Sequence, residues 1–119
     1  MKTYQDLVSE AKQHVQLVPA DKLEKAISDS HALIDVREES EYAQGHIPGA
    51  IHMSRGVIEA RLSMVPNYQN PETRIVLYCR TDARATLVAA SLQNMGYVAV
   101  EVLTGGFEAW SQAGRPIQK

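Results

Sequence analysis

The chain has 119 residues, of which 45% are hydrophobic and 22% are charged, and its formal net charge is −2. This length and composition fit one globular domain with a hydrophobic core of its own. The charge balance argues against a nucleic-acid-binding protein, which usually has a basic excess, and no apolar run is long enough to span a membrane.

The chain contains a single cysteine, Cys79, which excludes an internal disulfide and a cysteine-based structural zinc site. Residues 1–15 include acidic residues and lack the apolar core of a secretory signal. We therefore expect a cytoplasmic location, where a free thiol persists. His14, His31 and His52 lack metal-ligand spacing, so no metal site is expected.

In chain order, the first predicted element is an amphipathic helix over residues 3–15, with Thr3 as its N-cap and Asp6 three residues later. We expect this helix either to cover the sheet or to dock a partner. A short apolar stretch follows it, and then a second short helix that begins near Pro19. Residues 32–36, with the sequence ALIDV, are typical of a buried strand.

The middle of the chain predicts a one-turn helix that Gly45 closes, followed by a turn at Pro48 and Gly49. The later elements are a short strand at 50–53, a helix at 56–65, a polar loop at 67–73, a strand at 74–79, a helix at 84–95, a strand at 98–103 and a helix at 107–114. The strand RIVLYC at 74–79 gives the strongest of these signals.

Short strands that alternate with helices favour an α/β fold with a mostly parallel sheet covered on both faces. In such sheets, ligands bind where the carboxyl ends of the strands meet the loops that lead into helices. Cys79 occupies this kind of position, directly after the most apolar strand.

A cysteine acts as a nucleophile in its thiolate form, which a helix N-terminus or a nearby arginine stabilises. Arg80 and Arg84 flank the loop after Cys79, and a helix that begins near Ala83 would direct free N–H groups toward the sulfur. The alternative is that Cys79 is a small core residue, as many free cysteines are. The order of strand, cysteine, short loop, arginine and helix favours the nucleophile.

The sequence resembles the single-domain rhodaneses, a family of sulfurtransferases. The motifs that carry the resemblance are LIDVREESEYAQGHIPGAIHM from Leu33, IVLYCRTDAR from Ile75, MGY from Met95 and LTGGFEAW from Leu103. The resemblance implies a three-layer α/β/α rhodanese-like fold with a central, mostly parallel five-stranded sheet. It places the rhodanese domain at 18–119 and leaves 1–17 as an added N-terminal helix, within one globular unit.

The same resemblance implies that Cys79 takes a sulfane sulfur from thiosulfate or a persulfide donor and becomes a persulfide. The sulfur then passes to a thiol or cyanide acceptor, and a protein acceptor is also allowed; no cofactor is expected. The substrate-binding residues implied by the resemblance are the loop residues whose backbone amides would surround the persulfide: Arg80, Thr81, Asp82, Ala83 and Arg84.

The length of this loop separates sulfur chemistry from phosphorus chemistry. Phosphatases and arsenate reductases of related fold have one more residue between the cysteine and the arginine, which encloses a tetrahedral oxyanion. Here four residues separate Cys79 from Arg84, which favours a single sulfur atom. The alternatives are a weakly active or non-catalytic module that relays or binds sulfur and, more distantly, a phosphatase or arsenate reductase.

The loop departs from the commonest family pattern at two positions. Asp82 stands where the family often has glycine or another small residue, and Ala85 stands where it often has serine or threonine. A glycine at position 82 would suit a positive φ, a region that Asp tolerates better than most residues. Asp82 also offsets the attraction of Arg80 and Arg84 for a dianion, so we expect a preference for a less charged donor than thiosulfate.

Arg37 is interpreted as the structural partner of a nearby carboxylate, in preference to an acid/base cluster with Asp35 and Glu41. Arg55 has two open interpretations, as an anion clamp at the pocket or as a solvated surface residue. The other residues of interest are expected to be structural, His46 as a hydrogen-bonded turn residue, Trp110 in the core with its N–H paired, and Gly105 and Gly106 as a flexible turn.

Overall fold

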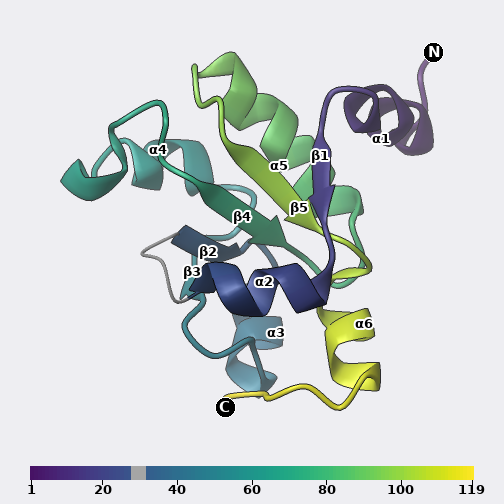
Figure 1. The fold of residues 1–119 in the computed structure, drawn as a ribbon. Helices are drawn as coiled ribbons and strands as arrows, with labels where there is room; N and C mark the ends of the chain where they lie inside the picture. The colour runs from purple at the N-terminus through teal and green to yellow at the C-terminus, as the bar shows by residue number, and fades with distance from the viewer. Residues whose placement is uncertain (28–31) are drawn as a thin grey trace.

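The computed structural model describes residues 1–27 and 32–119. Its centre is a five-stranded sheet in the order β1-β5-β4-β2-β3, and each neighbouring pair is parallel (Figure 1). The strands are β1 (Gln16–Val18), β2 (Ala32–Asp35), β3 (Ile51–His52), β4 (Ile75–Tyr78) and β5 (Val100–Leu103). The predicted fold class is therefore confirmed.

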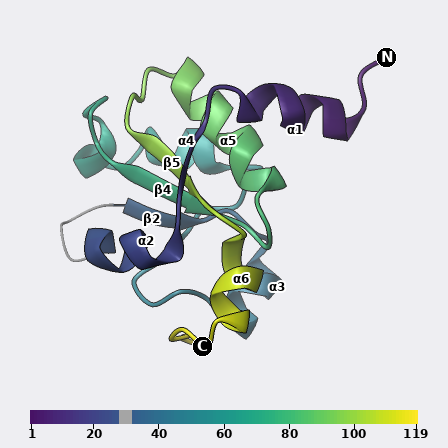
Figure 2. The ribbon, with the colours of Figure 1, turned by 45° about the vertical axis from the view of Figure 1, so that its right-hand side comes forward.

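Helices lie on both faces of the sheet, which gives three layers (Figures 1 and 2). They are α1 (Tyr4–Lys12), α2 (Ala20–Ile27), α3 (Glu39–Gln44), α4 (Ile58–Leu62), α5 (Ala83–Asn94) and α6 (Gly106–Gln112), with a 3-10 turn at Pro66–Tyr68 that overlaps the start of the predicted polar loop. None of the helices in the described ranges is both long enough and apolar enough to cross a lipid bilayer.

The sheet divides the hydrophobic core into two clusters, and successive side chains of β4 enter the two clusters alternately. Ile75 and Leu77 pack in the cluster that includes α4 and α5, whereas Val76 and Tyr78 pack in the cluster that includes α6. All four side chains are buried, because successive strand residues point to opposite faces and both faces are covered. This burial fixes β4, and therefore the residue that follows it, in the middle of the molecule.

The N-terminal helix α1 begins with the predicted capping box. The Thr3 hydroxyl accepts the N–H of Asp6, and the Asp6 carboxylate accepts the N–H of Thr3. The helix buries Val8 and Ala11 and packs against α5, so it lies outside the helical layer and not directly on the sheet (Figure 2). It ends at Lys12, earlier than the predicted range of 3–15.

Candidate functional site

Cys79 lies between the end of β4 and the start of α5, at the carboxyl end of a central strand. Its side chain is 1% exposed, and Sγ accepts a hydrogen bond from the backbone N–H of Ala85 with an N–S distance of 3.4 Å. This amide belongs to the first turn of α5, where the helix dipole favours negative charge. The arrangement therefore places a backbone donor and the positive end of a helix dipole at the Cys79 sulfur.

The loop after Cys79 differs from the sequence-based expectation in two details. The amide that contacts the sulfur comes from Ala85, one residue beyond the predicted set that ends at Arg84. The backbone of Asp82 has φ −144° and ψ −13°, so a positive φ at this position is not required. Because the chain turns into α5 without the left-handed region, the aspartate causes no backbone strain of that kind.

The N-terminus of α6 supports the loop from the other side. The N–H of Phe107 donates to the carbonyl of Cys79 and the N–H of Glu108 to the carbonyl of Arg80, both at 2.9 Å. These bonds turn the two carbonyls toward α6. The close approach depends on Gly106, whose φ is 59° and where a Cβ would lie only 2.5 Å from the Cys79 oxygen.

Gly106 is thus a site residue that sequence reasoning had treated only as part of a flexible turn. Adjacent glycines before a helix indicate either a turn or a close backbone approach, and the sequence alone does not identify the partner backbone.

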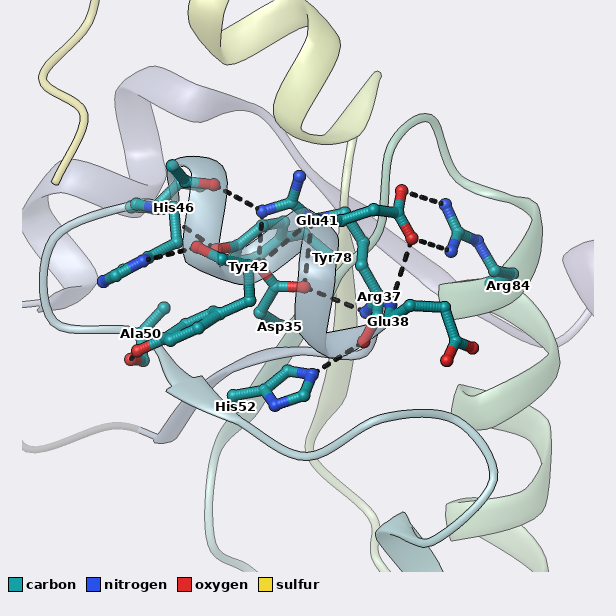
Figure 3. Close-up of polar contacts among 12 residues, drawn as sticks. Asp35, Arg37, Glu38, Glu41, Tyr42, His46, Ala50, His52, Tyr78 and Arg84 are labelled. Carbon is teal, nitrogen blue, oxygen red and sulfur yellow. Dashed lines mark hydrogen bonds and ion pairs between the residues drawn. The ribbon is translucent and has the colours of Figure 1, made fainter. Parts of the chain in front are cut away.

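Arg84 is held by Glu41 of α3 in a two-bond ion pair. Arg84 Nη1 lies 2.7 Å from Glu41 Oε1, and Nη2 lies 3.1 Å from Oε2 (Figure 3). The hydrogen bond with Arg84 is the main cause that lowers the pKa of Glu41 to about 2, and the same bond raises the pKa of Arg84. The arginine that follows the loop is therefore fixed by an element far away in the sequence.

Two further ion pairs lie around the loop. Arg80 Nε is 3.2 Å from Glu108 Oε2 of α6, and Lys12 Nζ, at the end of α1, is 3.2 Å from Asp82 Oδ2. Each charged residue of the loop thus has a partner of opposite sign on a different helix. The three positive charges of these pairs, counting Arg84, are therefore offset by three negative charges.

Arg37 is buried between the segment that ends α3 and the first turn of α6. Its guanidinium donates to both carboxylate oxygens of Asp35, at 2.7–3.1 Å, and to the carbonyl of Gly45 at 2.7 Å (Figure 3). It also lies over the ring of Phe107, 4.3 Å from the centroid. The predicted structural ion pair is confirmed, and it joins the first motif to the GGF motif.

An open cleft of about 470 Å³ lies beside the loop, between α3 and α6. It is lined by Arg37, Glu41, Arg80, Phe107, Glu108, Ser111 and Gln112. We call it the α3–α6 cleft. Its mixed charges and one aromatic ring offer contacts to a small polar molecule.

Arg55 lies elsewhere, along a second groove between α1 and α5 that Leu7 and Leu87 also line. It does not line the α3–α6 cleft. Thr81 and Ala83 lie in the loop and at the start of α5, and their predicted contact with a bound sulfur remains a prediction.

The remaining structural predictions concern His46 and Trp110. His46 Nδ1 lies 3.1 Å from the carbonyl of Tyr42, and its ring stacks on that of Tyr42. Trp110 is 2% exposed and donates its indole N–H to the carbonyl of Pro116 at 2.7 Å. The hydrogen bond predicted for each of these side chains is confirmed. His31 lies outside the described residues.

Comparisons with known proteins agree with this geometry. A sulfurtransferase of Allochromatium vinosum is 34% identical over 105 residues, which cover 87% of this chain and 94% of that protein. A Rhodopseudomonas palustris structure of unknown function, described as a possible tyrosine phosphatase, superposes with a TM-score of 0.84 at 29% identity and covers 99% of this chain and 96% of its own. A thiosulfate sulfurtransferase structure from Pseudomonas aeruginosa gives a TM-score of 0.77 at 25% identity, over 89% of this chain and 20% of that one.

The family match covers most of the described molecule. The rhodanese-like domain matches residues 19–113, a range that includes every strand of the sheet except β1, together with Cys79, its loop and the α6 support. The chain therefore belongs to the rhodanese-like domain family.

Proposed function

We propose that this protein is a sulfurtransferase that works through a persulfide on Cys79. The observation that carries the proposal is the Cys79 sulfur at the carboxyl end of β4, with the Ala85 N–H directed at it. An amide of a helix N-terminus stabilises the thiolate that must attack and also the anionic persulfide that forms. The name of the Allochromatium vinosum relative supports the same class of reaction.

The reaction with thiosulfate requires no cofactor. The Cys79 thiolate attacks the sulfane sulfur, a new S–S bond forms, and the original S–S bond breaks as sulfite leaves with its electron pair. A thiolate or cyanide acceptor then attacks the outer sulfur of the Cys79 persulfide. The bond to Sγ breaks, and Cys79 returns to the thiolate form.

The charge balance around the loop bears on the choice of donor. Arg80, Arg84 and Lys12 are each paired with an acid, so the loop offers little net positive charge to a dianion such as thiosulfate. We therefore infer that a persulfide donor with less negative charge, such as cysteine persulfide, is preferred over thiosulfate. The α3–α6 cleft is the place where the remainder of such a donor would lie.

The test is intact-protein mass spectrometry after incubation with thiosulfate or with cysteine persulfide. We expect Cys79 to gain one sulfur atom, faster from the persulfide, and to lose it on addition of cyanide with formation of thiocyanate. The Cys79→Ser variant is the control and should gain none. Loading without release to any acceptor would indicate a sulfur-binding or relay module, and no loading from either donor would contradict the proposal.

A phosphatase is the second candidate, because the Rhodopseudomonas palustris neighbour is described as a possible tyrosine phosphatase. The four-residue spacing between Cys79 and Arg84 argues against it, and Arg84 is engaged by Glu41. Hydrolysis of para-nitrophenyl phosphate that depends on Cys79 would favour the phosphatase over the sulfurtransferase.

A further inference from the structure

Asp82 stands at the N-cap of α5 but does not cap it. Its carbonyl accepts the first helical hydrogen bond, from the N–H of Thr86 at 2.9 Å. Aspartate is among the preferred residues at this position, because its carboxylate accepts the N–H of the second or third helical residue. Here the side chain makes no such bond.

One of the two amides that a capping Asp82 could engage is already in use at the candidate site. The third residue of α5 is Ala85, and its N–H is the one that donates to Cys79 Sγ. An ionised carboxylate is a much stronger acceptor than sulfur for such a donor. A form of α5 in which the Asp82 carboxylate accepts the Ala85 N–H would therefore withdraw this hydrogen bond from Cys79.

Two features of the structure oppose the capped form. The carboxylate of Asp82 is held by Lys12, with Nζ 3.2 Å from Oδ2. The backbone of Asp82 has ψ −13°, outside the extended region from which N-cap side chains usually reach the helix. Capping would require release of the carboxylate and a change in this dihedral angle.

Helix α1 places Lys12 for this contact. The helix packs against α5 and buries Val8 and Ala11, and its last residue lies near the end of the Cys79 loop, where α5 begins. Lys12 precedes the residues matched by the family, 19–113, whereas Asp82 lies within them. The ion pair therefore joins the matched domain to the segment before it.

We propose that Lys12 is a positioning residue that keeps the Asp82 carboxylate off the first turn of α5, so that the Ala85 N–H remains with the Cys79 sulfur. The effect matters for activity only through the proposed function, on which it rests in that respect. What Lys12 changes directly is the hydrogen bonding of the Cys79 sulfur. It is therefore tested without any sulfur donor.

The measurement is the titration of the Cys79 thiolate by its ultraviolet absorbance, with the titration of Cys79→Ser subtracted. The signal is unambiguous because the chain has one cysteine. Lys12→Gln frees Asp82 to cap, and we expect about threefold less thiolate at a fixed pH on the rising part of the parent curve, because the Ala85 N–H is then withdrawn from the sulfur. Lys12→Arg keeps the ion pair and should restore the parent titration.

Lys2→Gln is the matched control for loss of one positive charge. Lys2 pairs with Glu10 of the same helix, 2.7 Å away, and does not contact Asp82. We expect this variant to titrate like the parent protein. An equal loss of thiolate in Lys2→Gln and Lys12→Gln would assign the effect to net charge and overturn the proposal.

Two substitutions of Asp82 separate capping from charge. Asn and Ala are both uncharged, but Asn caps helices well and Ala does not. We expect less Cys79 thiolate at the same pH in Asp82→Asn than in Asp82→Ala, and no further loss when Lys12→Gln is added to Asp82→Ala. If both neutral variants share one titration curve and Lys12→Gln has the same effect in either background, the proposal fails.

Mass spectrometry and thiolate titration test the sulfurtransferase and the role of Lys12 separately. A protein that shows the expected set of thiolate titrations but gains no sulfur in mass spectrometry would keep the role of Lys12 and lose the sulfurtransferase. A protein that loads sulfur through Cys79 while all the variants titrate alike would keep the sulfurtransferase and lose the role of Lys12.

Discussion

Glu41 shows how a single residue fixes the loop from a distance. It is a half-buried residue of a six-residue helix, and its carboxylate accepts from both terminal nitrogens of the Arg84 guanidinium. The two-bond geometry limits the rotation of the guanidinium, so the arginine after the Cys79 loop keeps one orientation. Sequence reasoning grouped Glu41 with Asp35 and Arg37, because those residues are close in the chain, and did not identify Arg84 as its partner.

The ion pair predicts a specific loss of stability in acid. The pKa of Glu41 is lowered from 4.5 to about 2, mainly by its hydrogen bond with Arg84. A carboxylate with a lowered folded-state pKa stabilises the protein above the unfolded-state pKa, and this contribution disappears as the pH falls toward the folded-state value. Between pH 4.5 and about 2, the parent should lose about 1–2 kcal/mol more unfolding free energy than Glu41→Gln, after allowance for solvent screening.

Urea unfolding at a series of pH values measures this difference. Glu39→Gln, in the same helix, is the control for loss of one acidic side chain and should follow the parent curve. Parallel curves for the parent and Glu41→Gln would show that the Arg84–Glu41 pair contributes nothing in this pH range.

At the scale of secondary-structure elements, α6 and the Cys79 loop meet backbone to backbone. A Cβ added at Gly106 would overlap the carbonyl oxygen of Thr81 and lie 2.5 and 2.7 Å from those of Cys79 and Arg80. The φ of 59° at Gly106 adds a conformational penalty for any other residue. The element that supports the loop therefore tolerates no side chain at this point.

Gly106→Ala is expected to move α6 away from the loop and to lower the unfolding free energy by about 2–4 kcal/mol. Because the two carbonyls held by α6 would be released, we also expect slower sulfur loading of Cys79. Thermal unfolding and the loading assay report the two effects. The control is Gly56→Ala, since a Cβ at Gly56 meets no atom within 4 Å; equal behaviour of the two variants would contradict this account.

The elements were predictable to different degrees, for physical reasons. The strands β2 and β4 and the helix α5 follow from local apolar patterns and a terminating glycine, which are properties of short segments. The position of Cys79 between β4 and α5 follows from the same patterns. The 3-10 turn at Pro66–Tyr68 was taken for a loop, since one turn of this kind leaves no periodic signal.

The partners of the site residues could not be predicted in the same way. Lys12 and Asp82 are seventy positions apart in the chain, and Arg84 and Glu41 are forty-three apart. Such pairs depend on how α1 and α3 pack around the sheet, which no local pattern encodes. The sequence therefore supplies candidate site residues, whereas the partners that hold Arg84 and Asp82 are visible only in the structure.

At the scale of the whole molecule, β4 is the element on which the site depends most. It lies between β2 and β5 in the parallel sheet, and its side chains enter both core clusters. A loss of packing anywhere along β4 affects both faces. The alternation of strands and helices in the sequence predicted this sheet, but only the structure shows that all neighbouring strand pairs are parallel.

Leu77→Ala should destabilise the protein by about 2–5 kcal/mol, because a fully buried leucine is replaced by a cavity. Leu17→Ala is the matched control, since Leu17 lies on the edge strand β1 and is 51% exposed. The same substitution there should change the unfolding free energy by less than about 1 kcal/mol. Similar midpoints in chemical denaturation for the two variants would contradict the central role of β4.

The burial of the single cysteine has a consequence for damage by oxidants. If Cys79 is oxidised to a sulfenic acid, this chain holds no second thiol with which it could condense to a disulfide. Repair must then come from an outside reductant that reaches a sulfur whose residue is 1% exposed. A sulfur atom already attached to Sγ would be oxidised first, and a reducing thiol that cleaves the S–S bond would return Cys79 intact.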